Sequence, residues 1–151
     1  MSNATNLTTL GDSCFNGATI NIQLPNASSS RISKIGHRAF YQLNGSISSS
    51  DIIDVNVPNV TNVGAEAFND MRSNKTFKFT KVQYIGNYCF NWTDTATAHT
   101  ITLDQTTVPT LGDYAFGGTV SSNAKNTLRV KDNVRQALSA ISDYVIFETI
   151  E

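Results

Sequence analysis

Ile35-Gly36-His37-Arg38-Ala39-Phe40 is one of five copies of a six-residue pattern in this chain. Each copy reads as an aliphatic residue, Gly, two variable residues, a small residue and Phe. The other copies begin at Leu10, Val63, Ile85 and Leu111, and successive motif glycines lie 25, 28, 22 and 26 positions apart. Self-similarity at a period of roughly 20–30 residues predicts a solenoid, in which each repeat is one coil that buries its apolar face against its neighbours.

The conserved spacing of the motif suggests a role for each of its positions. If the coils stack in register, the five motif phenylalanines form one column along the solenoid axis. They are Phe15, Phe40, Phe68, Phe90 and Phe116. Gly suits a position where a side chain would clash or where the backbone must adopt a positive φ. The small residue three positions after Gly lets adjacent coils approach closely.

Short segments between the motifs alternate polar and apolar residues, which predicts the strands of one parallel sheet with aliphatic side chains pointing inward. We expect these strands at 19–24, 53–57, 77–79, 101–103 and 128–130. The aliphatic pairs before each Gly lie on irregular or short helical return paths. About five coils are expected over residues 5–125, and residues 1–4 resemble the remnant of an expression tag.

The last segment changes its period. Val134, Ala137, Leu138 and Ile141 fall at i, i+3, i+4 and i+7, the apolar stripe of an amphipathic helix. Asp132 or Asn133 is the expected N-cap, and a short strand is expected at 144–147. Because a solenoid ends in an apolar cross-section, we interpret residues 126–151 as a capping unit.

The repeated motif, together with a strand that ends in Leu24-Pro25, resembles the BspA-like bacterial leucine-rich repeats over roughly residues 5–130. The repeat lengths are uneven, and Thr80 and Asp104 stand where coils three and four lack the Pro. The resemblance implies an α/β repeat solenoid: a leucine-rich-repeat-like right-handed coil stack with one curved, mainly parallel sheet and a C-terminal helix-strand cap. It further implies a protein of bacterial surfaces that adheres to host proteins, matrix proteins or other cells, without a catalytic set.

Composition narrows the classes of function. The chain has 151 residues, 15% charged residues and a formal net charge of -1, which fits one domain. A nucleic-acid-binding protein would need a basic stripe, so no nucleic-acid partner is expected. The chain has no long apolar run, so no membrane insertion is expected. We expect a monomer in an extracellular or cell-surface location, with its export signal outside this sequence.

Nothing in the sequence predicts catalysis. Cys14 and Cys89 occupy the small-residue position in copies three coils apart. That spacing separates them by about 14 Å, whereas a disulfide requires Cα atoms within about 7 Å, so both are expected to be buried free thiols. His37 and His99 are expected to be solvated. No motif places a nucleophile beside a base, or acidic residues beside one another, so we expect a non-enzymatic protein without metal or cofactor.

The outward face of the predicted sheet is the candidate binding surface, because solenoids commonly bind through such an extended face. The residues expected to line it are Asn21, Gln23, Asp54, Asn56, Lys78, Thr100, Thr102, Arg129 and Lys131. Their partner would be a protein or a glycan. A merely solvated face is the alternative, and the protein is then a structural spacer or a virion tail component without a ligand. Tyr88 and Tyr114 share one motif position, so they either stack on an edge or pack on the convex surface.

Overall fold

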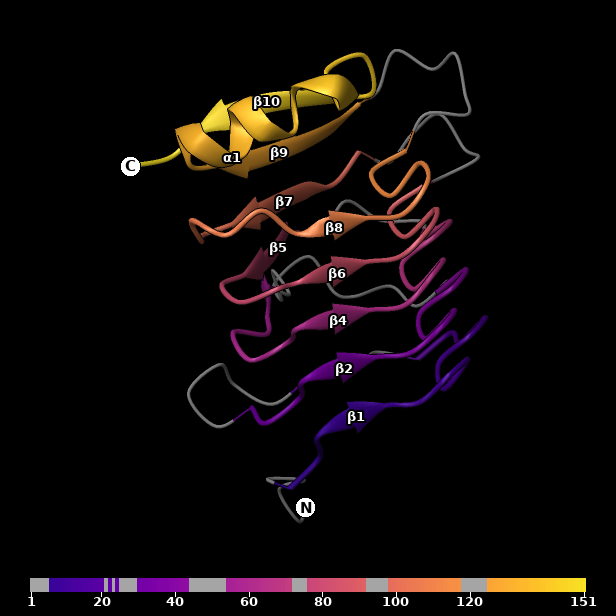
Figure 1. Ribbon diagram of the computed structural model, residues 1–151. Helices are drawn as coiled ribbons and strands as arrows, with labels where there is room; N and C mark the ends of the chain where they lie inside the picture. Colours follow the sequence, from indigo (N-terminus) through magenta and orange to yellow (C-terminus); the bar gives the residue numbers. More distant parts are fainter. Residues whose placement is uncertain are drawn as a thin grey trace.

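The chain winds into a stack of parallel-stranded coils with a short helix at its C-terminal end (Figure 1). The computed structural model describes residues 6–20, 22, 24, 30–43, 54–71, 76–91, 98–117 and 125–151, with the backbone alone at 54–56. The leucine-rich-repeat-like coil stack predicted from the repeats is confirmed.

One face of the stack is a parallel sheet, which we call the wide sheet. Its strands, in spatial order, are β10 (Val145–Thr149), β9 (Asn126–Val130), β7 (Thr100–Leu103), β5 (Thr76–Phe79) and β3 (Asp54–Asn56). Five of the six predicted strands are therefore present. The strand predicted at 19–24 is not: Thr19, Ile20, Ile22 and Leu24 lie outside any strand, and Asn21 and Gln23 lie outside the described residues.

The sequence predicted a single sheet, and this was wrong. The return paths form a second parallel sheet, the narrow sheet. Its two-residue strands are β1 (Thr9–Leu10), β2 (Lys34–Ile35), β4 (Asn62–Val63), β6 (Tyr84–Ile85) and β8 (Thr110–Leu111). Gly36 N–H donates to the Leu10 carbonyl at 2.9 Å, and Gly64 N–H donates to the Ile35 carbonyl at 2.8 Å. Backbone groups beside the core need partners, and the equivalent position of the next coil supplies them.

The predicted phenylalanine column is confirmed. Ring centroids of Phe15, Phe40, Phe68, Phe90 and Phe116 follow one another at 5.3, 5.2, 5.1 and 5.8 Å, with all four pairs stacked. Phe77 of β5 packs against this column, 4.7 Å from Phe68 and 4.9 Å from Phe90. The column and the inward side chains of both sheets make one continuous core.

The motif glycine is required for close approach and not for a positive φ. A Cβ added to Gly64 would lie 2.6 Å from the Gly36 carbonyl carbon and from the His37 nitrogen. The left-handed residue is instead the second one after Gly: Arg38 has φ 52° and Glu66 has φ 55°. This conformation turns alternate N–H groups toward the next coil, so that Arg38 donates to Ala65 and Phe40 donates to Ala67.

The C-terminal segment forms α1 (Asp132–Ala137), a 3₁₀ turn η1 (Ser139–Ile141) and then β10, which pairs in parallel with β9. Val134 and Leu138 of the predicted apolar stripe are buried, whereas Ala137 is exposed. The N-cap prediction was wrong. Lys131 takes that position without a side-chain cap bond, because the Asp132 carboxylate accepts from Arg135 and Gln136 within the helix.

The predicted exposure of His99 and the predicted burial of Cys14 were both wrong. His99 is 1% exposed, and its ring meets Phe77 edge-on at 5.6 Å. It lies two positions before the buried Ile101, so alternation along the chain places both side chains inward. Cys89 is buried and free as predicted, but Cys14 is exposed, because Phe15 and Cys14 belong to the outermost described coil.

The side chain of the buried Asn126, at the start of β9, forms hydrogen bonds with three backbone groups. Its amide nitrogen donates to the carbonyls of Phe90 (3.0 Å) and Phe116 (2.8 Å), and its oxygen accepts from His99 N–H (2.7 Å). The side chain therefore ties β9 to two coils of the Phe column.

Candidate functional site

The outward face of the wide sheet carries two rows of residue positions, because parallel strands in register place equivalent positions side by side. We call the first the threonine row: Asp54, Thr76, Thr100, Thr127 and Ile146. We call the second the charged row: Asn56, Lys78, Thr102, Arg129 and Glu148. Each row crosses all five strands.

Six of the nine residues predicted for this surface fall in the two rows by strand register, and the side chains of four of them are described. The six are Asp54, Asn56, Lys78, Thr100, Thr102 and Arg129. Lys131 follows β9 and contacts this face from the end of the strand. Asn21 and Gln23 lie outside the described residues, so their predicted contribution stays a prediction.

Five described charges on this face are paired with one another. Lys78 Nζ lies 3.0 Å from Asp104 Oδ2, and Lys131 Nζ lies 3.8 Å from Asp104 Oδ1. Arg129 Nε contacts Glu148 Oε2 at 3.2 Å along the charged row. The hydrogen bond from Lys78, with the charges of Lys78 and Lys131, lowers the pKa of Asp104 although partial burial opposes this.

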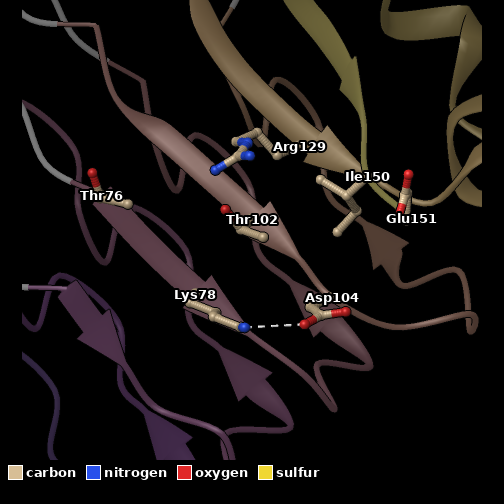
Figure 2. Close-up of a pocket in the computed structure, with 7 residues that line it drawn as sticks. All are labelled: Thr76, Lys78, Thr102, Asp104, Arg129, Ile150 and Glu151. Atoms are coloured by element: carbon tan, nitrogen blue, oxygen red, sulfur yellow. Dashed lines mark ion pairs between the residues drawn. The ribbon is translucent and has the colours of Figure 1, made fainter.

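A shallow pocket of about 330 Å³ lies on this face between β5 and the residues that follow β10. Figure 2 shows the ion pair of Lys78 with Asp104, with Thr102 on the strand next to Lys78 and Thr76 further along the strand of Lys78. Arg129, Ile150 and Glu151 complete the lining. Hydroxyls, ammonium groups and carboxylates here offer hydrogen-bond donors and acceptors to a polar ligand. Among the described residues, no three His, Cys, Asp or Glu side chains are grouped to hold a metal ion.

Sequence reasoning missed several residues of this surface. Thr76 and Thr127 extend β5 and β9 by alternation beyond the predicted strand bounds, and Glu148 extends β10 in the same way. The sequence pattern identified Asp104 only as the residue that follows its strand where Pro follows the earlier strands, and did not place it on this surface. The register Leu103↔Val130 carries it beside Lys131, which no pattern within one repeat could indicate.

A second group of side chains consists of tyrosines, of which Tyr88 is partly buried and Tyr114 and Tyr144 are exposed. The rings of Tyr88 and Tyr114 stack at 5.4 Å, which confirms the stacked pair. Tyr144, which precedes β10, meets Tyr114 edge-on at 6.1 Å. The contact of Tyr88 with Tyr114 therefore joins two adjacent coils, and the contact of Tyr114 with Tyr144 joins them to the C-terminal segment.

Comparison with known proteins agrees with this architecture. A family model described as "BspA type Leucine rich repeat region" matches residues 1–123 with six copies, one more than the five motifs found by inspection. Searches of curated proteins and of solved structures found no match. No helix in the described ranges is long and apolar enough to cross a membrane. Since the family model covers most of the chain and the coils are present in the structure, the protein belongs to the BspA-type leucine-rich repeat family.

Proposed function

We propose that this protein is a non-enzymatic recognition module that binds a partner protein through the threonine and charged rows of the wide sheet. Membership of a leucine-rich repeat family supports a role in protein interaction or at a surface. The proposal extends this to a bacterial cell-surface or secreted adhesion module that acts as a monomer.

The observation that carries the proposal is the register of the two rows. Four parallel strand pairs hold the positions of the rows side by side, so the side chains stand on a backbone that has little freedom left to lose. Threonine has few χ1 states, and the Lys78 and Arg129 side chains are already oriented by their carboxylate partners. Preorganisation of this kind lowers the entropic cost of association.

The chemistry of the face favours a polar partner. Lys78, Arg129 and Lys131 present cations, Asp104 and Glu148 present carboxylates, and the threonines supply hydroxyls. Arg is a residue type enriched among interface anchors, and Ile146 adds an apolar contact at one end because it is 51% exposed. A protein surface with mixed charges matches this pattern, and a glycan would use the hydroxyls and charges in the same way.

The test is a pair of charge-reversal variants of equal net charge. The first is Lys78→Glu with Arg129→Glu on the wide sheet. The control is Lys34→Glu with Lys81→Glu, two exposed residues away from the rows. Each replacement lowers the charge by two, so both variants change from the formal net charge of -1 by the same amount. Exposed ion pairs contribute about 0–1 kcal/mol each, so both variants should keep a melting temperature near that of the wild type.

Binding would be measured against panels of purified extracellular matrix proteins and of glycans. The proposal expects a partner that binds the wild type and the control variant but loses affinity for the wide-sheet variant. Equal binding by both variants would contradict the assignment of the face. If none of the three proteins binds any member of either panel, the structural-spacer interpretation is favoured.

A further inference from the structure

β10 is the last strand of the wide sheet, and one of its edges faces away from β9 (Figure 1). Ile150 N–H donates to the Val130 carbonyl at 2.9 Å. Because N–H and C=O groups alternate in direction along a strand, Ile146, Glu148 and Ile150 direct theirs toward β9. Val145, Phe147 and Thr149 therefore direct theirs outward, and in the described part of the chain no strand other than β9 pairs with β10.

This edge lacks Pro, Lys and bulges, and its one charged side chain, Glu148, is paired with Arg129 rather than left free to repel a further strand. Proteins protect edge strands with Pro, Lys, bulges or very short strands. The five residues of β10 include no Pro, Lys or Gly, and they pair with β9 in unbroken register. Such an edge is a template for strand addition, in which main-chain bonds supply affinity and side-chain neighbours supply specificity.

The side chains around the edge indicate which strand would fit. On the inner face lie Val145 and the partly buried Phe147, which favour apolar neighbours. On the outer face lies Glu148, whose side chain is 56% exposed although it pairs with Arg129. Residues 143–151 contain Asp143, Glu148 and Glu151 and no basic residue. Charge complementarity therefore favours a basic strand and disfavours a second copy of this acidic segment.

We propose that the free edge of β10 captures an extended segment of a partner protein by strand addition, and that this segment alternates apolar residues with Lys or Arg. Its apolar side chains would continue the inner face beyond Val145 and Phe147. Its basic side chains would continue the charged row beyond Glu148. This site is distinct from the two rows, since it uses backbone groups at the end of the sheet.

The experiment compares two substitutions of one exposed residue. Thr149→Pro removes an outward N–H and places a ring at the edge, while the bonds to β9 remain. Thr149→Ala also removes the threonine hydroxyl but keeps the backbone N–H. The probe is a fluorescein-labelled peptide of alternating Val and Lys, seven residues long by design, followed by fluorescence anisotropy. Loss of the N–H and steric blocking should weaken binding by about tenfold or more in Thr149→Pro, and Thr149→Ala should bind as the wild type does.

Two further readouts make the result specific. Peptide binding should slow amide hydrogen exchange at Phe147 and Thr149, and replacing Lys by Glu in the peptide should weaken binding. The proposal is overturned if the Val-Lys peptide does not bind the wild type, if Thr149→Pro and Thr149→Ala bind it equally, or if those amides exchange unchanged. It is also overturned if sedimentation shows a wild-type dimer that Thr149→Pro converts to monomers, because the occupant would then be a second copy.

Discussion

Gly86→Ala tests the close approach of neighbouring coils most directly. The added Cβ would lie 2.4 Å from the Ala65 nitrogen, 2.7 Å from the Ala65 Cα and 2.7 Å from the Gly64 carbonyl carbon. Ordinary contact begins at 3.4 Å, so the two coils would have to separate by 1.0 Å at the closest point. All three neighbours are backbone atoms, so no side chain can rotate away to make room.

The cost follows from the bonds that join these coils. Gly86 N–H donates to the Val63 carbonyl at 2.9 Å, and Glu66 N–H donates to the Asn87 carbonyl at 2.8 Å. A separation of this size would stretch both beyond roughly 3.5 Å, where a hydrogen bond is largely lost. Two bonds at about 1 kcal/mol each, with about 1–3 kcal/mol for overpacking, predict a loss of about 3–5 kcal/mol in the free energy of unfolding.

Gly11→Ala is the matched control, because it changes the same motif position in the outermost described coil. An added Cβ there meets no atom within 4 Å. Reduced freedom of the unfolded chain should then leave stability unchanged or raise it by up to about 1 kcal/mol. Urea denaturation followed by circular dichroism would give the midpoint and slope for both variants. Equal midpoints for Gly86→Ala and Gly11→Ala would refute the explanation of the motif glycine by coil contact.

Four other predictions concern the core, the thiols and the charged face. Phe68→Ala, at a position 1% exposed and stacked on both sides, should cost about 3–5 kcal/mol by urea denaturation, and Phe15→Ala at the end of the column should cost clearly less. Asn126→Ala leaves three buried backbone groups without their side-chain partner and should cost about 3 kcal/mol or more; a loss below about 1 kcal/mol would contradict this role. Ellman's reagent should modify the exposed Cys14 in the native protein and Cys89 only after unfolding. Burial raises the pKa of both thiols, so even Cys14 should react more slowly than free cysteine, and modification of Cys89 in the native state would count against its burial. The pKa of Asp104 lies below its ordinary value of 3.8, so the pair with Lys78 stabilises the fold above that pH, and this stabilisation is lost as the pH falls through the lowered pKa. In Lys78→Met, the midpoint of an NMR titration of Asp104 should move to higher pH. An unchanged midpoint would show that the pair is absent in solution.

The repeated motif carried enough information to predict the stack and its core. A period of 20–30 residues places equivalent side chains on neighbouring coils, so the Phe column and the alternation of the wide-sheet strands follow from counting along the chain. For the same reason, six of the predicted surface positions fall in two rows by strand register. The register places Lys78 beside Thr102 and Thr102 beside Arg129, and each of these residues alternates with apolar neighbours in its own strand.

Contacts between coils determined the remaining features, and a pattern within one repeat does not contain them. The narrow sheet exists because return-path backbone groups find partners only on the adjacent coil. Arg38 and Glu66 adopt a positive φ because this directs N–H groups to that coil. The buried His99 ring meets Phe77 of the neighbouring strand β5, a contact that no single repeat shows. Asp104 meets Lys131 because of the register between β7 and β9. The strand order leaves one edge of β10 without a paired strand among the described residues.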